Sequence, residues 1–329
     1  MGHVQGDDGK DAQILIVISN YNKEAELREC LPTLHTSIKH DGANVDRYRA
    51  FLTDSHSNDE SWEVMDKFRK SHSNITQLTL MNDVGAVRGF GRSVFNGLRR
   101  YPGAESVITI DSDAVVSPGF LKALSKKTNQ SGSIGMYATN QYDRKQSEIH
   151  SSTGHYVTIS GGALDRDYCD KPNTHGKSIL CPCFSGAMYS VRMLKQVRMI
   201  RGGGRTNHPY SHYYGCPELG FRAQLKGWDV EFVAEARMLH HRASPDEIEG
   251  TQKPNMEISR ALNIMRFFPS CEVEKSLARC FEDQHAHDKK ERIAEARRFL
   301  KTDEVTRLGT FSEEAKLKLF ERLVQVNGE

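Results

Sequence analysis

The N-terminal part of the chain alternates continuous apolar runs with segments whose apolar residues recur at helical spacing. Residues 14–19, ILIVIS, form an uninterrupted β-branched run, which is typical of a strand buried on both faces of a parallel sheet. Residues 22–38 follow with helical periodicity, and Pro32 within them predicts a local irregularity. Residues 47–54 then predict a second strand, so the pattern begins as strand, helix, strand.

The same alternation continues to about residue 111. Ser57 and Glu60 have the S-x-x-E form of a capping box that would open a helix over residues 60–70. A strand, a glycine-rich segment, a helix and a further strand are predicted next, over residues 76–81, 82–93, 94–101 and 106–110. This order predicts an α/β protein with a doubly wound sheet, in which ligands bind at the carboxyl ends of strands.

Beyond residue 120 the pattern is less regular. Residues 141–180 are polar apart from a short strand-like run, and residues 201–215 form a loop rich in glycine, histidine and tyrosine. We interpret this loop either as a lid over an active site or as an ordinary surface loop. Strands or helices are predicted over residues 121–128, 132–139, 155–160, 184–200, 216–228 and 229–239. From about residue 250 the chain is helical and highly charged, which is typical of a solvated appendage.

Composition and charge exclude some classes of partner. The 329 residues include 45 basic and 43 acidic side chains, so the formal charge of +2 provides no bulk field for nucleic acid or an anionic membrane. No run approaches the roughly 18 apolar residues of a transmembrane helix, and the N-terminus lacks the order of a signal peptide. We expect a cytoplasmic protein with no transmembrane segment.

The seven cysteines give no metal signature in the sequence. None are spaced as C-x-x-C, and reduced thiols are the expected state. Cys181-Pro182-Cys183 lacks a second pair at zinc-ligand spacing, so positions near a core are the preferred interpretation.

Asp111 and Asp113 interrupt an apolar run directly after a predicted strand. Side chains two residues apart in a strand share a face, so these carboxylates lie close together and favour a compensating cation. Oxygen ligands of this kind suit Mn²⁺ or Mg²⁺ together with substrate phosphates. A turn in which Pro118-Gly119 precedes the next helix is the alternative interpretation of this D-x-D sequence.

Residues after the other strands could complete a nucleotide pocket. Tyr21 offers an aromatic ring, Asp54 could accept a hydrogen bond from a base, and Arg88 and Arg92 lie in the glycine-rich segment. Each also has a simpler explanation: a core aromatic for Tyr21, a helix cap for Asp54, and a turn for the glycines.

The motifs in their order resemble the GT-A glycosyltransferases of family 2, over about residues 13–245. The specific parts are N-Y-N after the first strand, D-x-x-S-x-D after the second, and D-S-D after the fourth. IHSSTG and SGAMYSVR further resemble the rhamnosyltransferase-like branch. The resembling blocks are IVISNYNKEAELRECLPTL, LTDSHSNDES, NDVGAVRGFGRS, ITIDSDAVVSPGFL, FSGAMYSVRML and ELGFRAQLKGWDVEFVAEARMLHH.

This resemblance implies roles at the donor site. Tyr21 and Asp54 would contact the nucleobase, with Asn22 nearby, and Arg92 or alternatively Arg88 would face the diphosphate. Uridine is the favoured base because Asp54 stands where the family reads it.

The resemblance also implies a metal site. Asp111 would lie near the ribose and sugar and contribute to metal binding, and Asp113 would bind the metal most directly. His240 matches a position that completes the metal site in some GT-A enzymes, and His241 is the alternative. The implied cofactor is Mn²⁺ or Mg²⁺.

One departure from the family concerns the acceptor side. Where the family has E-D-x-D-L, this chain has Gly215-Cys216-Pro217-Glu218-Leu219, so Cys216 stands in the slot of the usual catalytic base. Glu218 is the remaining carboxylate, either as the base or as a group that orients the acceptor. PELGFR also resembles the acceptor helix of polypeptide GalNAc-transferases, so an inverting reaction is expected while a retaining one stays open.

The sequence therefore predicts a metal-dependent transfer of a sugar from a nucleoside-diphosphate sugar to a hydroxyl acceptor. A nucleotidyltransferase and a non-catalytic nucleotide-sugar-binding protein are the alternatives. We expect a flexible N-terminus over residues 1–12, a GT-A domain over residues 13–245, and a helical C-terminal extension over residues 246–329. The extension could cover the acceptor groove, form an oligomer or bind a partner. Its segment EISRALNIMRFFP, residues 257–269, resembles the short helix that often follows the family's last histidine and is expected to be integral, whereas the remaining charged helices are expected to be a solvated appendage.

Overall fold

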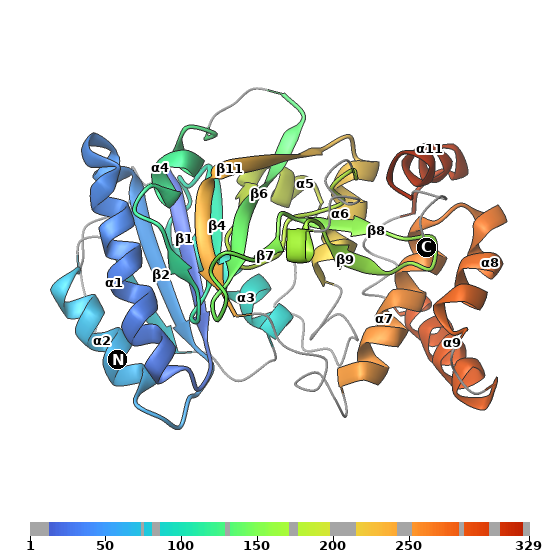
Figure 1. Ribbon diagram of the computed structural model, residues 1–329, viewed down its shortest axis with the longest axis horizontal. Coiled ribbons are helices and arrows are strands. Elements are labelled where there is room, and N and C mark those ends of the chain that lie inside the picture. Colours follow the sequence, from blue (N-terminus) through green and yellow to red (C-terminus); the bar gives the residue numbers. More distant parts are fainter. Residues whose placement is uncertain are drawn as a thin grey trace.

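A mixed β-sheet forms the centre of the molecule, with helices on both faces and a group of helices at one end (Figure 1). A computed structural model describes residues 13–73, 76–80, 86–128, 132–170, 177–197, 215–241, 252–282, 286–302 and 310–324. The sheet has the order β3-β2-β1-β4-β10-β6-β11-β5, with β7 paired to β6. Its strands are β1 (Ile14–Asn20), β2 (Tyr48–Asp54), β3 (Thr76–Leu80), β4 (Ser106–Asp111), β5 (Val115–Val116), β6 (Ile134–Asp143), β7 (His150–Ser152), β10 (Ala187–Ser190) and β11 (Asp229–His240).

The strand order reverses between β1 and β4. The strands β3, β2, β1 and β4 are parallel, and the chain moves outward from β1 to β3 before returning to β4 on the other side of β1. Asn20 is in register with Asp54, and Ser19 with Asp111. The carboxyl ends of these strands therefore meet beside the switch point, where α/β sheets bind ligands.

The side chains of β1 point alternately to the two faces of the sheet, and helices cover both faces. Ile14, Ile16 and Ile18 pack on one face in a cluster with α1 (Glu24–His40), α2 (Ser61–Ser71) and α4 (Phe120–Ser125). Leu15 and Val17 pack on the other face with α3 (Ala86–Arg100), α5 (Val191–Gln196) and α6 (Gly215–Leu225). Successive strand residues point to opposite faces, so a continuous apolar run is what a doubly covered strand needs. The predicted α/β fold class and the first strands are confirmed.

Two local predictions were wrong. Ser57 and Glu60 do not form a capping box: α2 begins at Ser61, and the Ser57 hydroxyl instead donates to Asp54 Oδ1 at 2.6 Å. The segment predicted as a glycine-rich loop is helical from Ala86, so Gly91 belongs to α3. The Ser57 hydroxyl bonds to Asp54 and is therefore not free to cap the helix. Glycine only weakly disfavours a helix, so the glycine-rich sequence did not prevent α3 from forming.

The charged helices beyond residue 269 are part of the packed structure rather than a solvated appendage, so the interpretation of these helices was wrong. Phe320 of these helices is buried in one cluster with Val157 and Leu180 from the middle of the chain. The same cluster contains Phe267 and Phe268, which belong to the segment 257–269 that was expected to be integral. Such a shared core ties these helices to the rest of the fold. The elements of this region are β8 (His155–Val157), β9 (Ala163–Asp165), α7 (Gln252–Phe267), α8 (Ser270–Cys280), α9 (Ala286–Leu300) and α11 (Glu313–Leu323), and short 3-10 turns are η1 (Gly42–Arg47) and η2 (Tyr168–Asp170).

Several predictions concern residues outside the described part of the chain. These are the N-terminus over residues 1–12, the boundary between residues 245 and 246, and the loop over residues 201–214. Within the described residues, no helix combines the length and the apolarity that crossing a membrane requires.

Helix α6 packs closely on the segment that precedes β10. A Cβ at Gly220 would lie 2.7 Å from Cys181 Cβ and 2.7 Å from the backbone oxygen of Leu180. Gly220→Ala is therefore expected to destabilise the protein by about 1–3 kcal/mol, because a backbone atom cannot yield easily. Gly91→Ala, where a Cβ meets nothing within 4 Å, is the control and is expected to be neutral or to stabilise α3 by about 0.5–1 kcal/mol. Urea unfolding of both variants measures this, and equal stability would contradict the packing.

Candidate functional site

Three side chains that could hold a metal ion converge at the end of β4. Asp111 closes β4, Asp113 lies in the turn that follows, and His240 is the last residue of β11. His240 Nε2 lies 3.2 Å from Asp111 Oδ2 and 3.4 Å from Asp113 Oδ1. All three residues are partly buried, and their ligand atoms lie within 4.8 Å of one another.

The topology explains this convergence. Directly after Asp113 the chain enters β5, which pairs antiparallel with β11, and Val115 is in register with Leu239. The pairing places the end of β11 beside the turn after β4. An imidazole far away in the sequence thus meets the two carboxylates at the switch point of the sheet.

The electrostatics of this cluster favour a cation. Burial lowers the pKa of His240, but the carboxylates of Asp111 and Asp113 outweigh it and hold this pKa well above the ordinary value. Burial raises the pKa of Asp113, but His240 and Lys23 outweigh it and the net direction is downward. Asp113 Oδ1 is buried and accepts no hydrogen bond of good geometry within the described residues. Two carboxylates and an imidazole suit a divalent cation such as Mn²⁺.

Three residues that support the cluster were missed in the sequence. Lys23 Nζ lies 3.7 Å from Asp113 Oδ2, Arg144 Nη1 donates to the Asp113 backbone oxygen at 2.8 Å, and Ser185 Oγ accepts from the Asp111 backbone at 3.2 Å. Lys23 directly follows the N-Y-N motif, which is a signal that could have found it. Arg144 and Ser185 reach the cluster only through strand pairing, so local sequence gives no indication of them.

The predicted nucleobase residues gather at the ends of β1 and β2. Tyr21 is 48% exposed, and Asn22 adopts a positive φ of 49° in the turn after β1. Asp54 is buried at 1% exposure, where Oδ1 accepts from Asn20 Nδ2 at 2.8 Å and Oδ2 accepts from the Ser57 backbone at 2.9 Å. The Asp54 carboxylate therefore fixes the loop after β2, whereas Tyr21 is exposed and Asn22 is partly buried.

The two candidate arginines both belong to α3. Arg92 is partly buried on this helix, whereas the side chain of Arg88 lies outside the described part of the structure. His241, the alternative to His240, follows the end of β11 and is not a member of the three-residue cluster.

Glu218 lies between two arginines. Its Oε2 accepts from Arg222 at 2.7 Å and its Oε1 from Arg266 at 2.9 Å, and the residue is 5% exposed. Burial raises its pKa, but the two guanidinium groups outweigh this and the net direction is downward. A carboxylate with a lowered pKa and both oxygens in ion pairs is a weak proton acceptor. This environment fits an organising role better than the role of a base.

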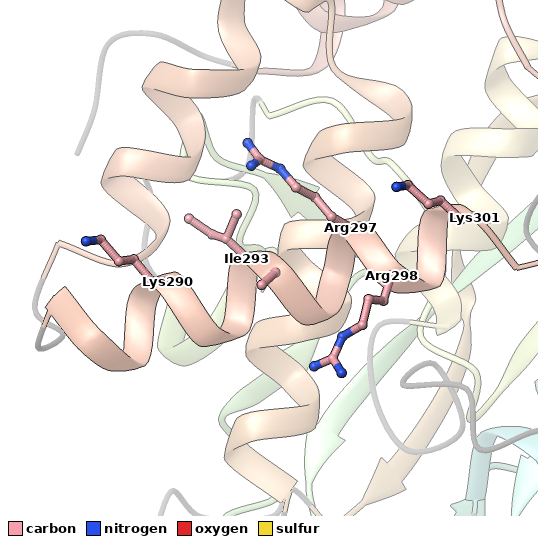
Figure 2. Close-up of a pocket in the computed structure, with 6 residues that line it drawn as sticks. Lys290, Ile293, Arg297, Arg298 and Lys301 are labelled. Carbon is pink, nitrogen blue, oxygen red and sulfur yellow. The ribbon is translucent and has the colours of Figure 1, made fainter.

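A basic hollow of about 450 Å³ lies away from this cluster, on α9 in the C-terminal helices. Figure 2 shows that Arg297 and Lys301 project to one side of α9 and Arg298 to the other. The hollow is lined by Lys290, Ile293, Ala294, Arg297, Arg298 and Lys301. It contains no carboxylate or imidazole, so it does not share the chemistry of the Asp111 cluster.

A comparison with protein families shows which family the chain belongs to. The model of "Glycosyl transferase family 2" matches residues 15–198, which is more than half of the chain. The chain belongs to glycosyl transferase family 2. No curated protein sequence is significantly similar to it.

Solved structures confirm that this family 2 chain has the GT-A fold. S. aureus TarS in complex with UDP-GlcNAc superposes with a TM-score of 0.52 at 13% identity, covering 82% of this chain and 71% of that chain. GalNAc-T7 with UDP, GalNAc and Mn²⁺ superposes with a TM-score of 0.60 at 13% identity, covering 89% of this chain and 57% of that chain. At such identities the likeness concerns the fold alone.

Proposed function

We propose that this protein is a metal-dependent glycosyltransferase that moves a sugar from a nucleoside-diphosphate sugar to a hydroxyl acceptor. The observation that carries the proposal is the convergence of Asp111, Asp113 and His240 at the switch point of a family 2 sheet. The structural relatives support it, because TarS is a complex with UDP-GlcNAc and GalNAc-T7 one with UDP and Mn²⁺.

The nucleoside would bind over the ends of β1 and β2. The exposed ring of Tyr21 offers a stacking surface for a base. Asp54 Oδ2 accepts one described hydrogen bond, from Ser57, and its second lone pair could accept the N–H of a uracil if the loop after β2 shifts. Arg92 on α3 is the candidate for the diphosphate, with Arg88 as the alternative.

The donor set at the strand ends fits Mn²⁺ or Mg²⁺. Asp113 would hold the ion most directly, and Asp111 and His240 would complete the protein ligands. When bound, a divalent cation stabilises the negative charge that develops on a leaving diphosphate. Arg144 holds the backbone of Asp113, and Ser185 holds that of Asp111, so the ligands are oriented before the donor arrives.

The acceptor motif retains one carboxylate, Glu218, and both of its oxygens are in ion pairs. We propose that Glu218 acts as a positioning residue, since its two ion pairs join α6 to α7. An inverting reaction, the predicted domain boundaries and an oligomer formed through the C-terminal helices stay predictions.

A panel of nucleotide sugars with Mn²⁺ tests the proposed function. Slow hydrolysis that releases a nucleoside diphosphate is expected, with UDP-sugars turned over faster than GDP- or dTDP-sugars. Release of pyrophosphate from a nucleoside triphosphate would instead indicate a nucleotidyltransferase. Tight binding of the sugar nucleotide without turnover, even with mixed acceptors, would indicate a non-catalytic binding protein.

A further inference from the structure

The fold brings three cysteines near one histidine, and none of these four residues is a member of the Asp111 cluster. His155 opens β8, where it is in register with Asp165 of β9 on one side and forms a bridge with Cys181 on the other. Its backbone nitrogen donates to Cys181 O at 2.8 Å. Cys183 follows Cys181 after one proline.

Helix α6 adds the third thiol. Gln224 on this helix donates to the backbone oxygens of Ile179 at 2.9 Å and Leu180 at 2.7 Å, which fixes α6 against the segment that carries Cys181. Cys216 lies near the start of α6, close enough to His155, Cys181 and Cys183 for their charges to affect its pKa. Residues remote in the sequence, whose local spacing predicts no zinc motif, are thus brought to the same region of the fold.

The contacts of His155 resemble those of a metal ligand. Nδ1 lies 3.7 Å from Cys181 Sγ, and the Cys183 side chain is a further neighbour that interacts with the imidazole. Two ligands of a tetrahedral zinc ion, at about 2.1 Å for nitrogen and about 2.3 Å for sulfur, lie about 3.5 Å apart. Nε2 is held by Asp165 Oδ1 at 3.1 Å, which is the way a carboxylate commonly orients a metal-binding histidine.

A buried hydroxyl faces the same group. Tyr189 of β10 is 2% exposed, its hydroxyl has no hydrogen-bond partner among the described residues, and its electrostatic neighbours are Cys181, Cys183 and Cys216. Thiols are weak acceptors, so they leave this donor unsatisfied. Thiolates bound to a metal are far better acceptors, and conversion to thiolates would give the hydroxyl a partner.

We propose that His155, Cys181, Cys183 and Cys216 bind a structural zinc ion. This is a Cys₃His donor set. Binding converts the three thiols to thiolates, leaves the imidazole neutral, and releases the three thiol protons and the Nδ1 proton of a charged His155 to water. No three of these ligand atoms lie within 4.8 Å of one another in the present structure, so binding requires a thiol to turn inward. A change of χ1 moves a cysteine sulfur without moving the backbone. The ion would fasten α6 to β8 and β9.

Metal analysis of the full chain tests this site. The purified protein is dialysed against dilute Zn²⁺ and then metal-free buffer, and zinc is measured by mass spectrometry. About one tightly bound zinc per chain is expected, with loss from Cys183→Ser and His155→Ala. Cys271→Ser, an exposed cysteine on α8, is the control and should retain zinc. His287→Ala should also retain it, which excludes the exposed His287, Asp288 and Glu291 group on α9.

Cobalt substitution keeps the test valid if a variant fails to fold. The unaltered protein loaded with Co²⁺ should show thiolate-to-cobalt charge-transfer absorption, which the Asp111 cluster cannot produce because it contains no sulfur ligand. Absence of both zinc and this absorption would overturn the proposal, as would zinc retained by Cys183→Ser. A disulfide between two of the three cysteines in the reduced-buffer preparation would also overturn it. Asp113→Asn should keep its zinc, so this result is independent of the proposed transferase activity.

Discussion

Asp113→Asn is expected to lower metal-dependent turnover of the donor by about a hundredfold to a thousandfold. The substitution keeps the volume of the side chain but removes a charge that lies 3.4 Å from His240 and 3.7 Å from Lys23. The proposed metal site would lose its most direct carboxylate. Release of nucleoside diphosphate at saturating Mn²⁺ measures the effect, and thermal unfolding without metal should show that the fold is retained.

Asp66→Asn is the matched control for this loss. Asp66 lies on α2, where it forms ion pairs with Arg69 and Lys70 at 2.7 Å on the surface. Its replacement should leave turnover unchanged, because exposed pairs contribute little. Equal turnover in Asp113→Asn and the unaltered protein would show that the Asp111 cluster is not the metal site.

Glu218→Gln is expected to destabilise the fold by about 3–5 kcal/mol. The amide would leave the guanidinium groups of Arg222 and Arg266 buried without their shared anion. Arg222 also donates to the backbone oxygen of Val197, so its position is fixed and it cannot turn to solvent without losing this contact. Urea unfolding gives the stability, and turnover at a temperature where the variant is folded gives the catalytic effect.

The comparison between stability and turnover separates the two roles of Glu218. A positioning residue loses stability together with activity, whereas a general base loses turnover while the unfolding midpoint stays unchanged. Glu231→Gln is the control, because Glu231 pairs with Lys127 at 2.6 Å in a partly exposed site and should cost less than about 1 kcal/mol. An unchanged midpoint with abolished turnover in Glu218→Gln would contradict the positioning role.

The strands and the pair of carboxylates at the candidate metal site could be predicted from the sequence because their signals are local. β1 is a continuous apolar run, and Asp111 and Asp113 follow a strand within the same short segment. His240 was found only through resemblance to the family, since the pairing of β5 with β11 is what brings it to the carboxylates.

The remaining features depend on contacts between distant parts of the chain. The Arg266 partner of Glu218 is 48 residues away, and the buried faces of the C-terminal helices are explained only by the core that they share with Val157 and Leu180. His155 and Cys181, 26 residues apart, are brought together by an isolated antiparallel bridge between their backbones. Local composition therefore favoured a solvated appendage and isolated thiols where the fold forms a packed core and a cluster.

The most direct test of the central claim is Mn²⁺ binding measured by electron paramagnetic resonance in the presence of UDP. The unaltered protein is expected to bind about one Mn²⁺ per chain, with affinity raised by UDP, because carboxylates and phosphate oxygens share the ion. Asp113→Asn should lose this binding, and Cys271→Ser, which replaces an exposed cysteine on α8, should keep it. Undiminished Mn²⁺ and UDP binding by Asp113→Asn would contradict the claim that Asp111, Asp113 and His240 join the metal to the donor diphosphate.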